Sequence, residues 1–396
     1  MTMDYRCISA DCHIDLCWLP HDLFVANASK SMKDRMPFVV DGPNGPTWIT
    51  KTGLTLSLAN RKDGPPTVDR IHRYVPGMEH RRDRMASTGL YSDSVLGAMR
   101  PATPQLRLQD QERDGIQAEV IYGLLGVGNT LSADTKTEGP EVAVEFYRIY
   151  NDWLIDFCSH DRRRFVGLAS IPSHSVDAAV TETRRVAKLA LGGLDFSPSF
   201  DMTPLWNPYW DPFWKAAAEV NLPVHFHTIG MPPVKPIPTD SPNKFHVMAR
   251  ATRMAGFQLH MASILSAIIH SGALERYPDL RIVLGESGIG WIPYVLSRMD
   301  YEYEGRFKDK LDLKMKPSDY WRRQCRATFQ NDAIGVKLLD DLGAETVMWG
   351  SDYPHSDGVF PDSQEYITRQ FSHLSGELRR KVTCENAGKF YGLIAA

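Results

Sequence analysis

The stretch LGGLDFSPSFDMTPLWNPYWDPFWKAAAEVNLPVHFH, residues 191–227, contains the pattern that decides the fold. Its two ends, 191–198 and 222–227, are short apolar runs of the length that buried strands have. Between them, DPFWKAAAEVN (211–221) has the apolar spacing of a helix. A strand, a helix and a second strand in this order predict a crossover unit whose two strands lie parallel in one sheet.

The same alternation continues along most of the chain. Further strands are predicted at 5–11, 118–123, 165–172, 280–286, 325–330 and 345–352. Further helices are predicted at 107–117, 140–159, 176–190, 256–278, 292–307 and 332–343, and two more close the chain. Eight strands, mostly separated by helices, predict a (β/α)8 TIM barrel of the α/β class.

The chain is longer than such a barrel requires. A barrel of this type takes ~250 residues, whereas the sequence has 396. Residues 22–104 have poor periodicity and several Gly-Pro turns, which predicts an inserted N-terminal arm or lid. Residues 228–255 are expected to form a long active-site loop. We therefore predict a single barrel domain over 1–396 with these two additions.

The composition narrows the class of protein. The chain is 43% hydrophobic and 23% charged, as ordinary soluble proteins are, and its net charge of −3 gives no field that would attract nucleic acid. No run reaches the ~18 apolar residues of a membrane helix, and the N-terminus lacks a signal pattern. The six cysteines form no C-x-x-C pair, which favours reduced thiols and a cytoplasmic location.

Polar residues follow the predicted strands at their carboxyl ends, where barrel enzymes have their active sites. Asp11 and His13 end the first strand, and His225 and His227 end the fifth. Side chains two positions apart share a face of a strand, so the members of each pair point together. His227, at the end of its strand, is the better ligand candidate, whereas His225 is a ligand or a hydrogen-bonded core histidine.

Further candidates follow the sixth and eighth strands. Glu286 lies within GESG, and Asp352 lies within GSDYPH, with His355 three residues later. Carboxylates and imidazoles gathered in one small volume destabilise one another without a cation, whereas they are usual ligands of a divalent metal. We therefore predict a metal site. Asp15 is expected to be a further ligand or an acceptor that orients His13.

Four segments carry a definite resemblance: SADCHIDLCWLP (9–20), LPVHFHTIG (222–230), LRIVLGESGIGWIPYVLSRMD (280–300) and VMWGSDYPHSDG (347–358). They resemble segments of the amidohydrolase superfamily, in the amidohydrolase-related (amidohydrolase 2) branch that includes aminocarboxymuconate-semialdehyde decarboxylase and the resorcylate decarboxylases. The resemblance covers nearly the whole chain from Ile8 and is weakest over 22–104. It implies a barrel enzyme whose metal is held by Asp11, His13, His227 and Asp352.

One position departs from that branch. Its decarboxylases have a catalytic histidine after the sixth strand, where this sequence has Glu286. Glu286 is therefore predicted to be the proton shuttle or a further metal ligand. With His225, Glu286 and His355 added to the other four, the ligands suffice for two ions, and a carboxylate bridging two ions is ordinary chemistry.

Three functions remain open. The first is a metal-dependent hydrolase or decarboxylase that acts on a small organic acid, amide or lactone, with zinc or manganese as the ion and with Asp352, Glu286 and His355 as catalytic candidates. The second is a dinuclear iron (or Fe/Mn) oxygenase that hydroxylates a small carboxylic acid. The third is a barrel retained as a scaffold. The expected partners are a small-molecule substrate and further copies of the chain, in a homodimer or higher homo-oligomer, with neither nucleic acid nor membrane.

Overall fold

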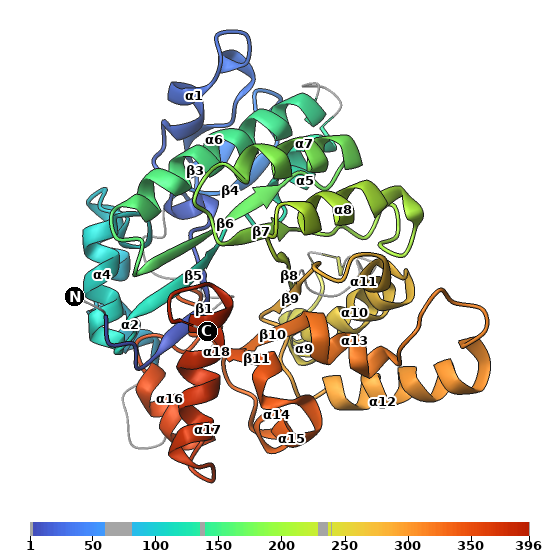
Figure 1. Cartoon of the computed structure of the whole chain (residues 1–396). Coiled ribbons are helices and arrows are strands. Elements are labelled where there is room, and N and C mark those ends of the chain that lie inside the picture. Colours follow the sequence, from blue (N-terminus) through green and yellow to red (C-terminus); the bar gives the residue numbers. More distant parts are fainter. Residues whose placement is uncertain (1–2, 60–80, 135–138, 229–236, 239, 396) are drawn as a thin grey trace.

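The computed structural model describes residues 3–59, 81–134, 139–228, 237–238 and 240–395 (Figure 1). The eight predicted barrel strands are present, at β1 Ile8–His13, β5 Ala118–Tyr122, β6 Phe165–Ile171, β7 Gly193–Phe196, β8 Val224–His227, β9 Ile282–Gly285, β10 Cys325–Phe329 and β11 Val347–Trp349. They form one parallel sheet in the order β1-β5-β6-β7-β8-β9-β10-β11. The (β/α)8 prediction is confirmed.

The sheet closes between its first and last strands. The His13 amide donates to the Tyr353 carbonyl at 2.6 Å, and the Asp352 amide donates to the Asp11 carbonyl at 2.8 Å. Gly350 lies at this seam, where an added Cβ would come within 2.5 Å of the Asp11 Cβ. Only glycine therefore lets the end of β11 approach β1 this closely, which brings Asp352 beside Asp11.

Helices cover the outer face of the sheet (Figure 1). Every residue of β6 and β8 is buried, as expected for parallel strands with a packed interior on one side and helices on the other. The helices that follow the barrel strands are α4 Pro104–Asp114, α5 Val127–Ser132, α6 Gly139–Ser159, α7 Val176–Val186, α8 Asp211–Glu219, α10 His260–His270, α11 Ala273–Arg276, α12 Ile292–Glu302, α13 Pro317–Gln324, α14 Ala333–Lys337, α15 Leu339–Leu342, α16 Ser363–Gln370, α17 Gly376–Arg380 and α18 Asn386–Phe390.

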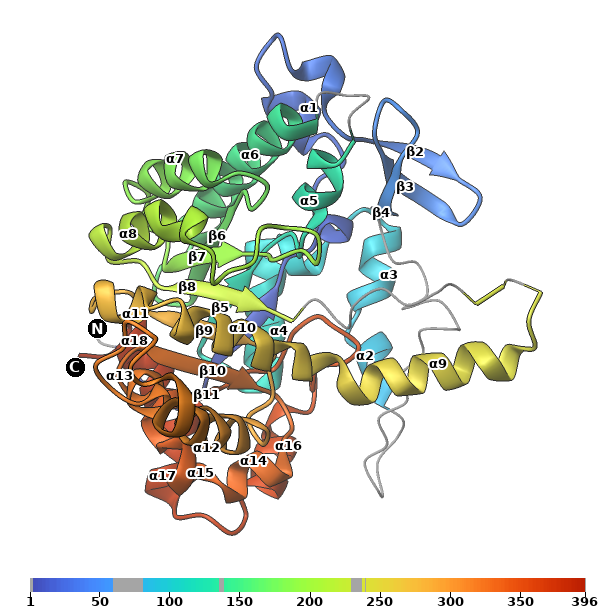
Figure 2. The same ribbon diagram turned by 90° about the vertical axis from the view of Figure 1, so that its right-hand side faces the viewer.

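The segment 22–104 has secondary structure of its own. It contains α1 Leu23–Asn27, the antiparallel sheet of β2 Phe38–Gly42, β3 Gly45–Ile49 and β4 Thr55–Leu58, and the helices α2 Arg81–Ser87 and α3 Leu90–Val95. Figure 2 shows that β2–β4, α2 and α3 lie on the side to which the barrel strands point. Residues 60–80 of the predicted arm lie outside the described residues, and the function of this segment as a lid stays a prediction.

The predicted loop 228–255 contains a helix that the sequence analysis missed. The helix α9, Asn243–Gly256, has no buried residue, and it projects from the barrel on the same side as β2–β4 (Figure 2). Phe245 and Met248 lie three residues apart and share one helical face, so the sequence did contain a helical pattern here that was overlooked. The helix also ends where the predicted helix 256–278 was expected to begin.

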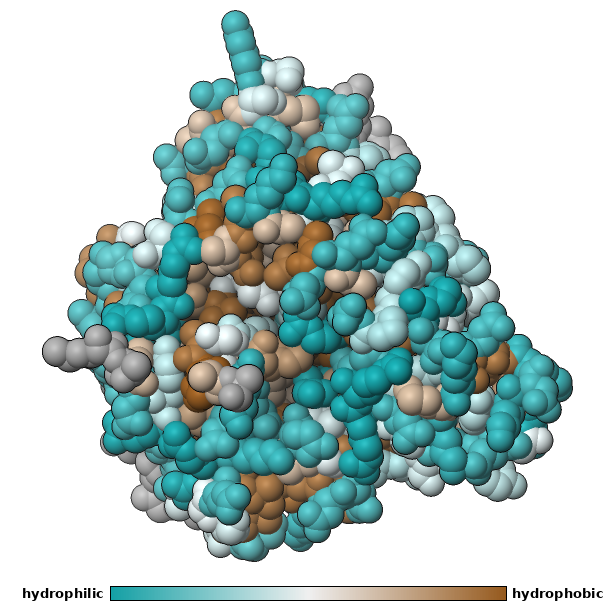
Figure 3. Space-filling model, in the orientation of Figure 1, coloured by the Kyte–Doolittle hydropathy of each residue, from teal (hydrophilic) through white to brown (hydrophobic). Residues whose placement is uncertain are grey.

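The surface agrees with the composition. Hydrophilic residues cover most of the face seen in Figure 3, and hydrophobic residues form patches between them. Within the described part of the chain, the structure has no helix with the length and apolar character needed to cross a membrane.

Candidate metal centre

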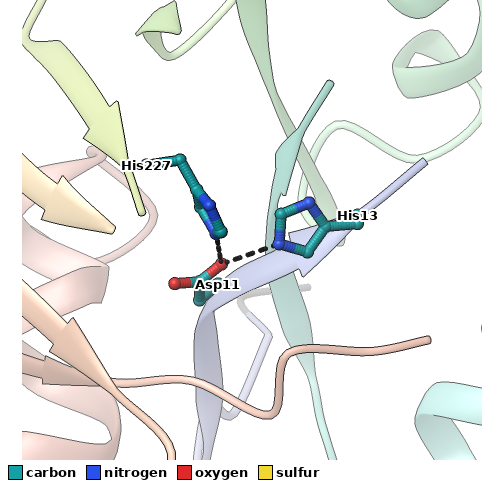
Figure 4. A group of neighbouring side chains, drawn as sticks. All are labelled: Asp11, His13 and His227. Carbon is teal, nitrogen blue, oxygen red and sulfur yellow. Dashed lines mark ion pairs between the residues drawn. The ribbon is translucent and has the colours of Figure 1, made fainter. Parts of the chain in front are cut away.

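The ends of three strands bring together the four ligands that the sequence resemblance implied. Nε2 of His13 lies 3.3 Å from Oδ1 of Asp11 and 3.2 Å from Oδ1 of Asp352. Nε2 of His227, at the end of β8, lies 3.6 Å from Oδ1 of Asp11. Figure 4 shows Asp11, His13 and His227 converging between β1 and β8. All four side chains are buried.

The geometry and the hydrogen bonding fit a divalent cation. One ligand atom each from Asp11, His13 and His227 lies within 4.8 Å of the others. Ligand atoms around a tetrahedral ion with bonds of about 2.1 Å are about 3.4 Å apart. Among the described residues, no hydrogen-bond partner meets the facing atoms of these three side chains or Oδ2 of Asp352. Buried polar atoms rarely lack partners, and an ion would provide one here.

The other oxygen of Asp11 is held by the neighbouring strands. Oδ2 accepts hydrogen bonds from the Thr328 hydroxyl of β10 at 2.5 Å and from the Glu286 amide at 2.7 Å. Sequence reasoning missed Thr328, although the alternation in CRATFQ could have placed it inside the barrel. It also missed Tyr122, whose ring lies against those of His13 and His227 with centroids 5.6 and 5.0 Å apart.

Glu286 lies beside the cluster on a strained backbone. Its φ is +48°, and that of Asp352 is +57°, conformations that cost of order 1–3 kcal/mol in non-glycine residues and concentrate at functional sites. Oε2 of Glu286 lies 3.7 Å from Nε2 of His227. Burial and the charge of Asp352 raise the pKa of Glu286 well above its usual range. A carboxyl group whose pKa is raised keeps its proton to higher pH and can act as an acid.

His355 lies between two carboxylates. Its Nδ1 is 2.8 Å from Oδ1 of Asp352, and its Nε2 is 2.9 Å from Oδ2 of Asp15. Its ring stacks on that of His13 with the centroids 4.0 Å apart. Burial alone would lower the pKa of His355, but the two carboxylates outweigh burial and raise it well above the usual range.

His225 is not brought to this cluster. It is buried in the barrel, with Nδ1 3.1 Å from the Pro223 carbonyl and Nε2 2.8 Å from the Tyr391 hydroxyl. Both ring nitrogens are therefore engaged, and burial lowers the pKa of His225 to about 3. These contacts are those of the core histidine that the sequence analysis left as the alternative.

The cluster predicts proton release when a metal binds. Burial lowers the pKa of His227, but the carboxylate of Asp11, 3.6 Å away, outweighs burial and raises it to about 9. Below that pH the ring carries a proton that the ion must displace. We expect Mn²⁺ binding at pH 7 to release about one proton per ion from His227, and the affinity to rise up to about tenfold per pH unit towards pH 9. Calorimetry in buffers of different ionisation enthalpy measures the protons released. A Mn²⁺ affinity that did not change between pH 6.5 and pH 8.5 would contradict the prediction.

Known proteins share the sequence pattern and the fold. Residues 122–393 match the family model described as Amidohydrolase. The chain is 21% identical over 294 residues to 2-amino-3-carboxymuconate-6-semialdehyde decarboxylase of Dictyostelium discoideum, covering 73% of this chain and 77% of that protein. It is 28% identical over 264 residues to gamma-resorcylate decarboxylase of Rhizobium sp. (strain MTP-10005), covering 63% and 79%.

Two solved structures share the fold. The amidohydrolase map2389c from Mycobacterium avium subsp. paratuberculosis K-10 is 18% identical, with a TM-score of 0.69 and 99% of both chains covered. The dihydroxybenzoic acid decarboxylase from Polaromonas sp. JS666, described with bound manganese and the inhibitor 2-nitroresorcinol, is 22% identical. Its TM-score is 0.58, with 73% of this chain and 86% of that chain covered.

Proposed function

Because this chain belongs to the amidohydrolase family, we propose that it is a metal-dependent decarboxylase of small aromatic carboxylic acids. The observation that carries the proposal is the buried cluster of two carboxylates and two imidazoles at the carboxyl end of the barrel. The names of the curated relatives support carboxyl removal, since both are decarboxylases. These relatives favour this function over the oxygenase alternative.

We assign Asp11, His13, His227 and Asp352 as the metal ligands. The bound ion would supply Lewis acidity, which polarises a substrate carboxylate and an adjacent hydroxyl. The manganese in the Polaromonas structure supports Mn²⁺ as the ion, although a mixed carboxylate and imidazole set also suits Zn²⁺. We propose one ion per chain, since His225, which the two-ion hypothesis required, contacts Pro223 and Tyr391 instead.

Decarboxylation breaks a ring carbon–carboxyl bond and forms a carbon–hydrogen bond, so a proton must reach the ring carbon as CO2 leaves. We assign this proton delivery to Glu286, whose buried carboxyl lies 3.7 Å from His227 and whose pKa is raised by burial. His355, in contact with Asp352, is the second proton carrier of the site.

The test uses 2,6-dihydroxybenzoate and 5-carboxyvanillate, the compounds named for two structural neighbours. We expect the Mn²⁺-loaded chain to release CO2 from at least one of them, the chelated protein to be inactive, and added Mn²⁺ to restore activity. Carbon dioxide release and the ultraviolet spectrum of the phenol product report the reaction. Lactone opening or amide cleavage, with no CO2 from either acid, would instead support the hydrolase alternative.

We also propose that the chain forms a homodimer or larger homo-oligomer in the cytoplasm. The exposed apolar side chains of Phe245, Val247 and Met248 on α9 support self-association. The six cysteines, all buried and free of disulfides, support a reducing compartment. A sedimentation mass equal to one 44.7 kDa chain would refute the oligomer.

A further inference from the structure

Asp15 lies beside the edges of two stacked imidazole rings of the site, those of His13 and His355. Its Oδ2 is 2.9 Å from Nε2 of His355, and its Oδ1 is 3.8 Å from Nδ1 of His13. The two rings are stacked with an interplanar angle of 21°. Asp15 directly precedes the buried 3₁₀ turn Leu16–Trp18, which fixes the backbone that carries its carboxylate. One carboxylate therefore faces one nitrogen of each ring.

The opposite nitrogens of the same rings face the metal cluster. Nε2 of His13 lies 3.2 Å from Oδ1 of Asp352, and Nδ1 of His355 lies 2.8 Å from the same oxygen. A neutral imidazole has a proton on one nitrogen and a lone pair on the other. Nδ1 of His13 has no hydrogen-bond partner among the described residues, and the 3.8 Å that separates it from Oδ1 of Asp15 is longer than a hydrogen bond. A small approach of the two groups would let Nδ1 donate to Asp15, and Nε2 would then keep the lone pair that a cation requires, which is how carboxylates orient metal-binding histidines.

We propose that Asp15 is a positioning residue that sets the tautomer and orientation of both His13 and His355. Through His13 it keeps a nitrogen lone pair aimed at the metal position. Through His355 it completes a chain of hydrogen bonds, Asp15–His355–Asp352, along the edge of the site. The role of Asp15 toward His355 rests on the proposed function. Its role toward His13 depends on metal binding alone.

A second cation is the competing explanation for this group. Ligand atoms of His13, Asp15 and His355 also lie within 4.8 Å of one another. However, the two nitrogens of His355 already face carboxylates on opposite sides of its ring. A neutral His13 ring has one lone pair and can bind one cation. To bind a second cation through Nδ1, His13 would have to release the first cation from Nε2 or lose the protons of both ring nitrogens. The geometry therefore favours a hydrogen-bonded chain, and metal stoichiometry separates the two explanations.

The test is Mn²⁺ titration of the metal-free full-length chain. We expect Asp15→Asn to weaken Mn²⁺ binding about 10- to 100-fold, the usual cost of losing a partner of a metal-bound histidine, because asparagine has one acceptor oxygen and cannot serve both rings. Wild type should bind one ion per chain. Asp15→Glu, which keeps both oxygens and the charge, should recover part of the affinity. Melting of the metal-free variants separates loss of affinity from loss of fold.

The matched control is Asp195→Asn. Asp195 is a buried carboxylate of β7 whose described hydrogen bond goes to the Gly123 amide at 3.3 Å. This variant removes a charge from the same interior, and we expect less than about a threefold effect on Mn²⁺ affinity. Equal losses in the Asp15 and Asp195 variants would overturn the proposal, because charge alone would then explain them. An unchanged Mn²⁺ affinity in Asp15→Asn would also overturn the proposal. So would a stoichiometry of two ions per chain in wild type and one ion per chain in Asp15→Asn, because Asp15 would then be a ligand of a second ion.

These metal measurements need no substrate, so they decide the proposal even if neither aromatic acid is decarboxylated. Where CO2 release is observed, Asp15→Asn at saturating Mn²⁺ should lower kcat about 10- to 100-fold with little change in KM, because His355 loses its orientation. A normal kcat in metal-saturated Asp15→Asn would overturn the assignment to His355.

Discussion

Replacing Asp11 with asparagine is expected to weaken Mn²⁺ binding by more than about 100-fold, beyond the 10- to 100-fold cost of losing a partner of a ligand. The reason is that both oxygens of Asp11 are used. Oδ1 faces His13 and His227, and Oδ2 accepts from the Thr328 hydroxyl and the Glu286 amide. Asparagine is neutral, and its amide nitrogen cannot accept either hydrogen bond. CO2 release should fall to the level of the chelated enzyme.

The metal content of dialysed protein and calorimetric titration measure this effect. Asp22→Asn, at an exposed aspartate outside the cluster, is the control and should bind Mn²⁺ as wild type does. If the Asp11 variant kept one ion per chain and full turnover, the ion would have to bind elsewhere, and both the metal centre and the proposed function would be wrong.

The sequence could predict which residues share a strand face but not how deep each one lies. The two-residue period placed Asp11 with His13, and His225 with His227, on common faces. Depth depends on strand register and on distant segments: β7 and β8 pair Asp195 with His225, and the hydroxyl that reaches His225 belongs to Tyr391, 166 residues away. No local pattern contains that contact.

The residues around the ligands were harder to predict for a different reason. Thr328 and Tyr122 are not typical metal ligands, and their contacts with Asp11, His13 and His227 arise only when β5 and β10 lie beside the other strands of the barrel. The same holds for Asp15, whose position two residues after His13 suggested contact with that ring. Its shorter contact is with His355, which comes from the other end of the chain.

Glu286→Gln should separate metal binding from proton transfer. We expect the variant to bind Mn²⁺ within about threefold of wild type, since the Glu286 group that contacts Asp11 is the backbone amide, which the substitution keeps. In contrast, kcat should fall by about 10²- to 10⁴-fold, the usual loss on removing a general acid. Glutamine has nearly the same shape but has no carboxyl proton to deliver.

The dependence of activity on pH provides a second test of the role of Glu286. Since burial and the charge of Asp352 raise the pKa of Glu286, the carboxyl is protonated and active below that pKa, and activity should decline as the pH rises through it. The residual activity of Glu286→Gln should lack this alkaline decline, whereas Glu377→Gln, at an exposed glutamate on α17, should keep both the rate and the profile of wild type. Full metal content together with full activity in Glu286→Gln would show that another group delivers the proton. The next candidate would then be His355, since its Nδ1 lies 2.8 Å from Asp352.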